Sequence, residues 1–275
     1  MTSQQDKAKV FHALHVNDPV LVLANAWDVA SARVVEAAGA SAVATTSAGA
    51  AWSLGYPDGD ALDVDRAVDL IARVVAAVGV PVTADIESGY AEDPRGVGAT
   101  IARVLDAGAV GVNLEDAHHG GPAPLRSVSD QAERLAAARA AADTAGIDLY
   151  LNARIDTYLR SVGDPADRLQ ATLDRAGAYL EAGASGLFVP GITEQATVAK
   201  LVEGIAAPLN LLVGPGAPSV SALGQLGVAR VSAGSSIAAA AYAVAQRAAV
   251  EMASTGEYTA ITGELDYGTL NALFT

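Results

Sequence analysis

Two carboxylates stand one residue apart in the segment VTADIESGY, which covers residues 82–90. The segment begins like a buried strand, and side chains at i and i+2 of a strand point to the same face. We therefore expect Asp85 and Glu87 to project together from a strand end. Two like charges that close repel, and burial makes each more costly, so the pair requires a compensating positive group.

The same alternation of polar residues recurs at the ends of two further apolar runs. The three sets are Asp85 and Glu87, then Asn113 and Glu115, then Asn152, Arg154 and Asp156. Each set is expected to face one side of its strand. A hydrophobic protein would not carry so many inward polar groups at one edge without a ligand, so these strand ends predict a binding or active site.

A hard divalent cation is the compensating group that these residue types favour. Asp85, Glu87 and Glu115 are oxygen ligands that would come from adjacent strands, and the set contains no His or Cys. Such a set suits Mg²⁺, or alternatively Mn²⁺, rather than Zn²⁺. Because Mg²⁺ usually keeps several waters, some of the three would act through water. The alternative is that Arg154 and backbone amides neutralise the carboxylates.

Arg154 is a candidate for binding an anionic substrate group. It is the only Arg that stands at a strand end in this alternation. Its guanidinium can grip a carboxylate or a phosphonate with two hydrogen bonds. The alternative is a structural salt bridge to Asp156 or Glu115, and the sequence leaves both roles open.

The segment TTSAGAAWSLGYPDGD, residues 45–60, follows another apolar run. Thr45, Thr46, Ser47 and Ala48 lie where a strand is expected to break into a Gly-containing loop. Backbone amides and hydroxyls of such a loop can cradle an anionic group. Hydroxyl residues at this kind of position also serve simply as turn formers. Asp58 follows a Pro and, by composition alone, is most often a turn residue.

Histidines fall in two places along the chain. His118 and His119 stand in EDAHHGGPAPL, where Gly and Pro indicate a flexible loop over the predicted site. A histidine in such a lid can act as a general acid, for which His119 is the candidate, and an exposed surface pair is an equal alternative. His12 and His15 precede the first predicted strand, and we expect both at the surface.

Eight short apolar, β-branched runs would position these residues, and a helical pattern separates each pair. The runs are VLVLAN (20–25), SAVATTS (41–47), VPVTADI (80–86), AVGVNLED (109–116), DLYLNARID (148–156), SGLFVP (185–190), LNLLVGP (209–215) and VARVSAG (228–234). Apolar strands that alternate with helices predict a parallel sheet covered on its faces. Eight such units predict an α/β fold, a single (β/α)8 TIM barrel. A doubly wound open sheet is the second possibility, although no G-x-G-x-x-G follows the first strand.

We expect one domain over residues 1–275, because no linker or break in composition divides the chain. Residues 235–275 exceed one closing helix, and we expect them to form a C-terminal helical extension that serves oligomerisation.

The composition of the whole chain disfavours several functional classes. The chain has 275 residues, a formal net charge of -14 and no Cys. The negative charge argues against a nucleic acid or an anionic membrane as partner, and no segment approaches the roughly 20 apolar residues of a membrane span. Without Cys there is no thiolate nucleophile, and Lys7, Lys9 and Lys200 lie away from the predicted site, so no lysine is placed for a Schiff base. No signal peptide is recognisable, and we expect a cytoplasmic protein.

Taken together, these motifs resemble the isocitrate lyase/phosphoenolpyruvate mutase superfamily, from about Leu23 to Ala240. ADIESGY is similar to the family's D-x-D-x-G-Y metal motif, with Glu87 in place of the second Asp. VNLEDA is similar to its I-E-D segment, and NARID to its A-R-x-D or A-R-x-E segment. TTSAGAAWSLGYPD is similar to its substrate-binding loop, which ends in S-L-G-x-P-D.

The resemblance implies a barrel in which Mg²⁺ is held, largely through water, by Asp85, Glu87 and Glu115. The residues implied to hold an α-keto acid or its enolate are Thr45, Thr46, Ser47 and Arg154. Asp58 is implied to help position the substrate or the metal-bound waters. The implied assembly is a homotetramer, a dimer of dimers in which the last barrel helix swaps between neighbours.

The chain departs from the family in its lid. Lyases of the family carry a K-K/R-C-G-H loop with a catalytic Cys after the fourth strand, where this chain has HHGGPAPLRS. The mutases use a Lys and an Asn in the same lid, and neither appears here. Pro190 and Gly191 stand where some relatives place a His or Glu. Cys-dependent cleavage and P–C bond chemistry are therefore disfavoured.

We predict a Mg²⁺-dependent lyase that cleaves a C–C bond of a small 2-oxo or 2-hydroxy dicarboxylate through a metal-stabilised enolate. The candidate reactions are oxaloacetate decarboxylation and isocitrate lyase-like cleavage. One alternative is a phosphonopyruvate-type mutase or hydrolase that acts on a P–C bond. The other is a non-catalytic protein that binds a 2-oxo acid.

Overall fold

All strands of the residues that the structure describes join one parallel sheet. The computed structural model describes residues 3–16, 19–263 and 265–275. Within them the sheet order is β1-β9-β8-β7-β6-β5-β4-β3-β2. The strands are β1 (Leu21–Leu23), β2 (Asn25–Ala26), β3 (Val43–Thr45), β4 (Val82–Asp85), β5 (Gly111–Glu115), β6 (Tyr150–Arg154), β7 (Gly186–Val189), β8 (Leu209–Leu212) and β9 (Arg230–Ser232).

The sheet closes on itself through the first predicted strand, which is divided into β1 and β2. β1 pairs with β9 on one side, and β2 pairs with β3 on the other, both in parallel. Each of the eight predicted apolar runs contains its strand, and helices alternate with the strands along the chain. The predicted (β/α)8 barrel is therefore confirmed.

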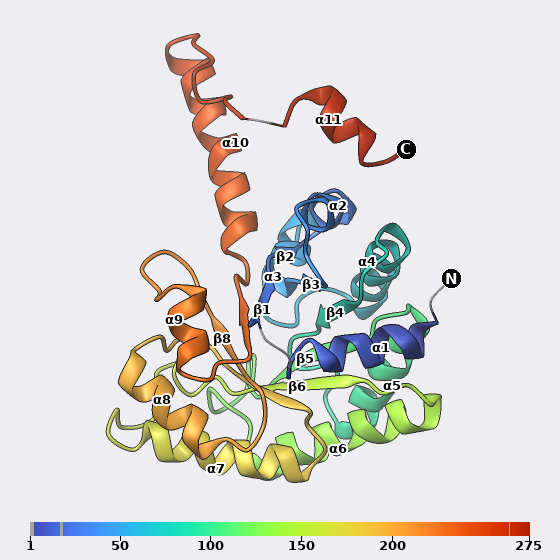
Figure 1. Ribbon diagram of the computed structural model, residues 1–275, viewed down its shortest axis with the longest axis vertical. Helices are drawn as coiled ribbons and strands as arrows, with labels where there is room; N and C mark the ends of the chain where they lie inside the picture. The colour runs from blue at the N-terminus through green and yellow to red at the C-terminus, as the bar shows by residue number, and fades with distance from the viewer. Residues whose placement is uncertain (1–2, 17–18, 264) are drawn as a thin grey trace.

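The helices of the described residues surround the barrel, except that the last two extend away from it (Figure 1). They are α1 (Gln4–Ala13), α2 (Val29–Ala37), α3 (Ser47–Ser53), α4 (Val64–Ala77), α5 (Pro94–Asp106), α6 (Val128–Ala145), α7 (Arg168–Glu181), α8 (Gln195–Gly204), α9 (Val220–Gln225), α10 (Ser236–Ser254) and α11 (Tyr267–Ala272). α4 illustrates why these segments fold. Asp63 caps its first turn, and the buried residues Ala67, Leu70, Ile71 and Val74 recur at helical spacing on the face toward the sheet.

The amino-terminal segment packs against one end of the barrel, and it corrects one prediction. His15 is buried, and its ring stacks on Tyr150 of β6 with ring centroids 3.7 Å apart. His15 Nδ1 also contacts the carbonyl of Phe11 at 2.8 Å. The prediction that His15 lies at the surface was wrong. In so short a segment, a buried aromatic cluster produces no periodic hydrophobic pattern from which its burial could be predicted. His12 is partly exposed and contacts the carbonyl of Asp148 at 3.1 Å.

The carboxyl-terminal segment leaves the barrel. α10 projects from it as an arm, and α11 lies to one side of that arm (Figure 1). Ala238 is the single buried residue of α10. Across the described part of the chain, no helix has the length and apolar character needed to cross a membrane. The exchange of this helix between neighbouring subunits stays a prediction.

Candidate active site

A cavity of about 210 Å³ opens at the carboxyl ends of the strands. Of the predicted site residues, those that line it are Thr46, Ser47, Ala48, Asp58, Asp85 and Arg154. The others, Thr45, Glu87, Glu115 and His119, lie outside its lining. Asn113 and Ser232 also reach this cavity, and Phe188, Pro190 and Leu212 give it an apolar wall.

Ser47 joins the two carboxylates that face the cavity. Its amide and hydroxyl both donate to Oδ2 of Asp85, at 3.1 and 2.8 Å, and its hydroxyl contacts Oδ1 of Asp58 at 3.4 Å. Ser47 is also the first residue of α3, with Thr46 as its N-cap. The predicted loop after this strand is therefore a short helix, since the Thr46 hydroxyl caps a buried, Ala-rich turn. Asp85 is further fixed by its own amide, which donates to Thr45 Oγ1 at 2.9 Å.

Glu87 does not share a face with Asp85, contrary to the expected strand alternation. β4 ends at Asp85, and Glu87 has a φ of 51°, in the left-handed region that non-Gly residues seldom adopt. Its carboxylate turns toward the loop after Ser53. There it accepts hydrogen bonds from the amide of Gly59 at 2.8 Å, from the amide of Asp60, and from the hydroxyl of Tyr90 at 3.3 Å.

A buried arginine that the sequence reasoning missed holds this turn in place. Arg134 of α6 donates to the carbonyls of Ser88 and Ala91 and, at 2.5 Å, to that of Glu92. Its side chain is fully buried. The signal that could have found it is its position on the inward stripe of α6, which an unpartnered Arg would not occupy.

Arg154 forms salt bridges with both Glu115 and Asp156, the two acids considered as partners in its alternative, structural role. Nη1 contacts Glu115 at 2.6 Å, and Nε contacts Asp156 at 2.6 Å. Burial alone would lower the pKa of the guanidinium, but the two carboxylates raise it, so Arg154 is charged at all ordinary pH values. Because it also lines the cavity, one guanidinium holds two barrel strands together and gives the cavity its positive charge.

His119 lies against Glu115, outside the lining of the cavity of about 210 Å³. Its Nε2 contacts Oε1 of Glu115 at 2.7 Å, and Arg160 Nη2 donates to its Nδ1 at 3.3 Å. The hydrogen bond to Glu115 raises the pKa of His119. His119 and His118 line a second, outer cavity of about 890 Å³.

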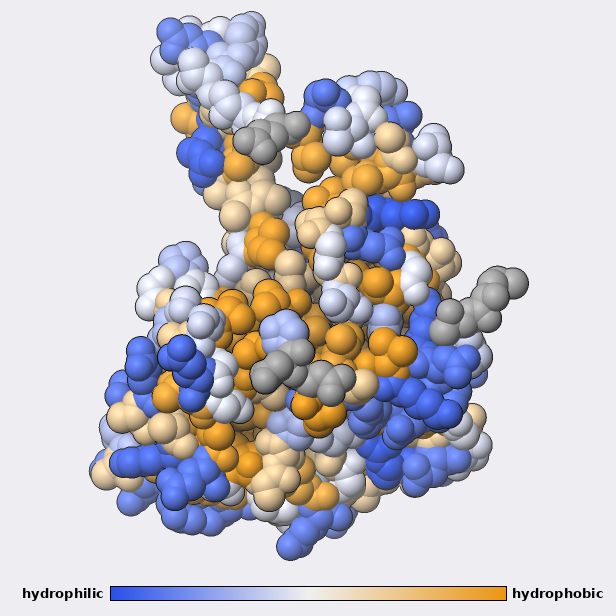
Figure 2. All heavy atoms as spheres, viewed as in Figure 1, coloured by the Kyte–Doolittle hydropathy of each residue, from blue (hydrophilic) through white to orange (hydrophobic). Residues whose placement is uncertain are grey.

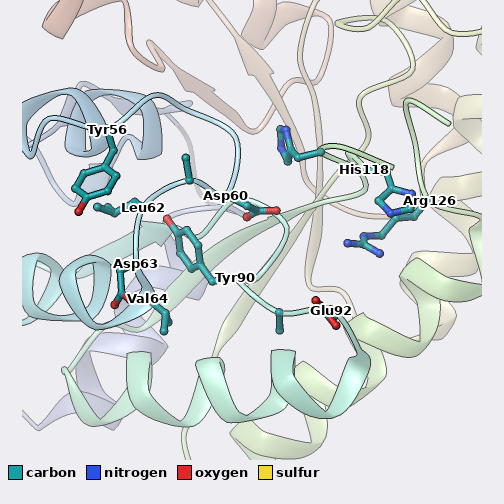
Figure 3. Close-up of a pocket in the computed structure, with 12 residues that line it drawn as sticks. Tyr56, Asp60, Leu62, Asp63, Val64, Tyr90, Glu92, His118 and Arg126 are labelled. Carbon is teal, nitrogen blue, oxygen red and sulfur yellow. The ribbon is translucent and has the colours of Figure 1, made fainter. Parts of the chain in front are cut away.

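The outer cavity is more open to solvent and has charged walls of both signs. Figure 3 shows Asp60 between the two tyrosines, Tyr56 and Tyr90, on one side and His118 with Arg126 on the other. The loop that carries the two histidines is therefore a wall of this outer cavity in the present structure.

The acids at the barrel mouth outnumber the cations that could neutralise them. Burial, with help from Asp60, Asp58 and Asp85, raises the pKa of Glu87 to about 7. Burial and then the charge of Asp85 raise the pKa of Asp58. Among the described residues, Arg154 is the one cation that lines the cavity, and it is already shared by Glu115 and Asp156. A further positive charge would therefore be stabilised here.

The donor set fits a hydrated Mg²⁺ better than a fully dehydrated ion. Among the residues that the structure describes, no three acidic, His or Cys groups lie close enough together to hold an ion directly. Asp85 and Asp58 face the cavity, while Glu87 and Glu115 lie outside its lining. One or two carboxylates and the remaining waters are the usual ligands of Mg²⁺ in such sites, so Asp85 with waters can hold the ion. The predicted set of Asp85, Glu87 and Glu115 could then act only partly by direct contact.

Sequence and structure comparisons show which known proteins this chain is similar to. A family model described as phosphoenolpyruvate phosphomutase matches residues 11–253. An uncharacterised protein of Mycobacterium tuberculosis is 38% identical over 82% of this chain and 81% of its own. A 2,3-dimethylmalate lyase of Eubacterium barkeri is 31% identical over 69% of each chain. A crystal structure from Burkholderia cenocepacia J2315, named as a lyase/mutase without a substrate, aligns with a TM-score of 0.91 at 39% identity, over 98% of this chain and 96% of its own.

Proposed function

The chain belongs to the phosphoenolpyruvate phosphomutase family, and from that premise we propose that it is a Mg²⁺-dependent lyase that cleaves a C–C bond of a small 2-oxo or 2-hydroxy dicarboxylate. The observation that carries the proposal is the cavity of about 210 Å³, which two carboxylates and one guanidinium line at the barrel mouth. It is smaller than the roughly 300–1,000 Å³ of pockets for drug-sized ligands, and so suits a small diacid.

The residues of the cavity divide the work of binding. Ser47 fixes the carboxylate of Asp85 with two hydrogen bonds, so that its second oxygen is free for a cation. Mg²⁺ held there would supply a Lewis acid that polarises the 2-oxo group and stabilises negative charge on its oxygen. Arg154 brings a permanent positive charge toward a substrate carboxylate. Phe188, whose ring lies 5.8 Å from the Arg154 guanidinium, and Leu212 give the cavity an apolar wall that excludes water.

Asp58 is the group best placed to hold the proton that the reaction needs. When CO₂ or an oxo acid leaves, the carbon that keeps the electron pair must take up one proton. In a 2-hydroxy acid, the hydroxyl that becomes the oxo group also releases one proton, so the two transfers balance. Asp58 lines the cavity, and its raised pKa favours the protonated carboxyl that can supply it. His119 is the alternative donor, and it would have to move in from the outer cavity to act.

Two other functions compete with this proposal. A mutase or hydrolase that acts on a P–C bond is favoured by the description of the matching family model. C–C cleavage is favoured by the relative named for 2,3-dimethylmalate, which is a 2-hydroxy dicarboxylate. A non-catalytic binder of 2-oxo acids would keep the same cavity but lack turnover.

We also propose that the enzyme is a homotetramer, a dimer of dimers built through the α10 arm. The arm carries exposed apolar side chains that include Tyr242, Val244, Val250 and Met252, and Figure 2 shows hydrophobic residues along it. Exposed apolar surface of this kind marks an interaction site in a folded protein. An exchanged helix between neighbouring subunits would cover it.

The test is to incubate the protein with 2-oxo dicarboxylates, 2-hydroxy dicarboxylates or phosphonopyruvate. Each incubation is run once with Mg²⁺ and once with a chelator, and the products are identified by mass spectrometry. We expect a dicarboxylate to give two fragments only when Mg²⁺ is present, and Asp85→Asn to give none. Release of phosphate or phosphonoacetaldehyde would replace the proposal by P–C chemistry. Tight binding without turnover over hours would identify a binder.

A further inference from the structure

A layer of amides lies in the barrel directly beneath the cavity. Asn152 Nδ2 donates to Oδ1 of Asn113 at 2.8 Å and contacts Oδ1 of Asn210 at 3.2 Å. Of these three residues, Asn113 is the one that lines the cavity. The sequence placed Asn113 at a strand end but gave it no role.

Arg230 lies under this layer, fully buried in β9. No carboxylate of the described residues forms an ion pair with it, and its Nε and Nη1 have no hydrogen-bond partner. Its Nη2 donates to Oδ1 of Asn113 at 3.3 Å. A buried guanidinium without a counterion is costly, so its retention in the barrel calls for a role.

The two donors fix which way the amide of Asn113 points. Arg has five N–H donors and no acceptor, so the atom of Asn113 that faces Arg230 must be the oxygen. The Asn152 amide reaches the same oxygen. The Nδ2 of Asn113 is therefore the free end of the amide, and no described residue accepts a hydrogen bond from it. Since Asn113 lines the cavity, a donor is left there for a ligand.

We propose that Asn113 is a substrate-binding residue whose Nδ2 donates a hydrogen bond to an oxygen of the bound oxo acid at the cavity floor. Arg230 and Asn152 act as positioning residues that hold the amide in this orientation. The inference rests on the proposed function, because it assumes that an anionic oxo acid occupies this cavity. An acceptor-only carboxylate or enolate oxygen is the ligand atom that matches a fixed N–H donor.

Asn113→Asp is the direct test, with oxalate as the ligand in the presence of Mg²⁺ and calorimetry as the readout. The Asp side chain has the same shape as Asn. One carboxylate oxygen can still accept the hydrogen bonds from Asn152 and Arg230, and the other places negative charge at the position of Nδ2. We expect oxalate affinity to fall roughly 100-fold, with the melting temperature little changed. Asn113→Ser, which replaces the amide donor by a shorter hydroxyl without adding charge, should weaken binding roughly 10-fold and serves if the Asp variant does not fold.

Asn210→Asp is the control for a buried charge in the same layer away from the cavity lining. Because the Nδ2 of Asn210 donates to two carbonyls and to the Ser232 hydroxyl, the melting temperature of this variant is measured beside its affinity. Asn210→Asp should leave oxalate affinity within roughly threefold of the wild type. Equal losses in both Asp variants would overturn the proposal, since any buried charge would then suffice. So would unchanged binding by Asn113→Asp and Asn113→Ser.

Arg230 is tested by comparing Arg230→Met with Arg230→Gln, which keeps an amide donor toward Asn113. Oxalate binding should weaken in the Met variant and recover in the Gln variant. If Arg230 had only a structural role, the affinity of each variant for oxalate would change only as far as its stability changes. Recovery of stability without recovery of affinity would contradict the positioning role. If wild-type protein fails to bind oxalate with Mg²⁺, the proposed function fails, and the inference falls with it; wild-type binding with an unaffected Asn113→Asp defeats the inference alone.

Discussion

At the scale of single residues, Arg154 is the side chain on which most of the site converges. It neutralises Glu115, which is 4% exposed, and Asp156, which is 0% exposed, while itself facing the cavity. Removing one partner of a buried ion pair leaves the other charge uncompensated. Arg154 is therefore expected to contribute to stability as well as to substrate binding, and the two roles that the sequence left open are compatible.

Arg154→Gln should lower the free energy of unfolding by about 3–5 kcal/mol, because Glu115 and Asp156 lose the guanidinium that they share. Among the described residues, the two acids then keep only His119 and Arg160 as cationic neighbours. Urea denaturation measures the loss. In the background of Glu115→Gln the same substitution should cost less, as a double-mutant cycle would detect. A loss under about 1 kcal/mol would mean that solvent already screens the pair.

Glu87 predicts how stability depends on pH. Burial raises its pKa in the folded protein to about 7 from an ordinary value of 4.5. Between these values the folded protein keeps a proton that the unfolded chain has released, so stability should fall as pH rises through this window. The loss amounts to about 3 kcal/mol in all, and it should be smaller with saturating Mg²⁺, which favours the ionised carboxylate.

Denaturation of the metal-free protein between pH 4.5 and 7 checks this expectation. Glu87→Gln should flatten the fall, since Gln does not titrate. An equally steep fall in that variant would assign the pH dependence to other groups.

At the scale of elements, the turn after β4 shows what a local pattern does and does not determine. The apolar run before Asp85 predicted the strand, because burial on both faces of a parallel sheet selects such residues. The reversal at Glu87 was not predictable, because a positive φ at a Glu is held by contacts with Arg134 and with the loop at Gly59, both distant in sequence. The strands were thus readable from the sequence, but the direction of this carboxylate was not.

The same reasoning explains the other differences between expectation and structure. Ser47 was read as part of a loop, yet it begins a helix that depends on packing of its Ala-rich face. Asn113 and Arg230 gained their roles only when distant strands brought them into one layer. The sequence motifs predicted which residues lie at the rim of the barrel. The hydrogen-bond and ion-pair partners of these residues depend on tertiary contacts, which the motifs do not contain.

Arg134→Met should loosen the turn after β4 without unfolding the barrel. Three carbonyls would lose their donor, so amide hydrogen exchange over residues 86–92 should accelerate by roughly 10–100-fold. Mg²⁺ affinity should also weaken, because Glu87 lies in this turn. Arg95→Met, at an exposed position of α5, is the matched control and should change neither. Unchanged exchange in Arg134→Met would remove it as the clamp of this turn.

At the scale of the whole molecule, the α10 arm is the part of the fold that a single chain leaves uncovered. Val244 is 41% exposed and Val250 is 62% exposed, and Tyr242 and Met252 of the same helix are exposed as well. The length of residues 235–275 predicted an extension, but the sequence alone could not say what covers it. A second copy of the chain is the proposed partner.

Val244→Glu combined with Val250→Glu should reduce the molar mass in solution toward that of the 27.6 kDa monomer, as read by light scattering. Burying a charge in an apolar interface costs more than the contact provides. Gln246→Glu adds one charge at an exposed polar position of the same helix and should leave the mass unchanged. A wild-type protein that is already monomeric would exclude the proposed assembly.

The central claim is that a hard divalent cation binds at the barrel mouth beside Asp85 and Asp58. The most direct measurement is the anomalous scattering of Mn²⁺ in a crystal soaked with that ion and oxalate. The account predicts a peak within the cavity of about 210 Å³, with Asp85 or its waters as ligands. A well-resolved cavity without such a peak, in which Arg154 alone balances the surrounding acids, would contradict it.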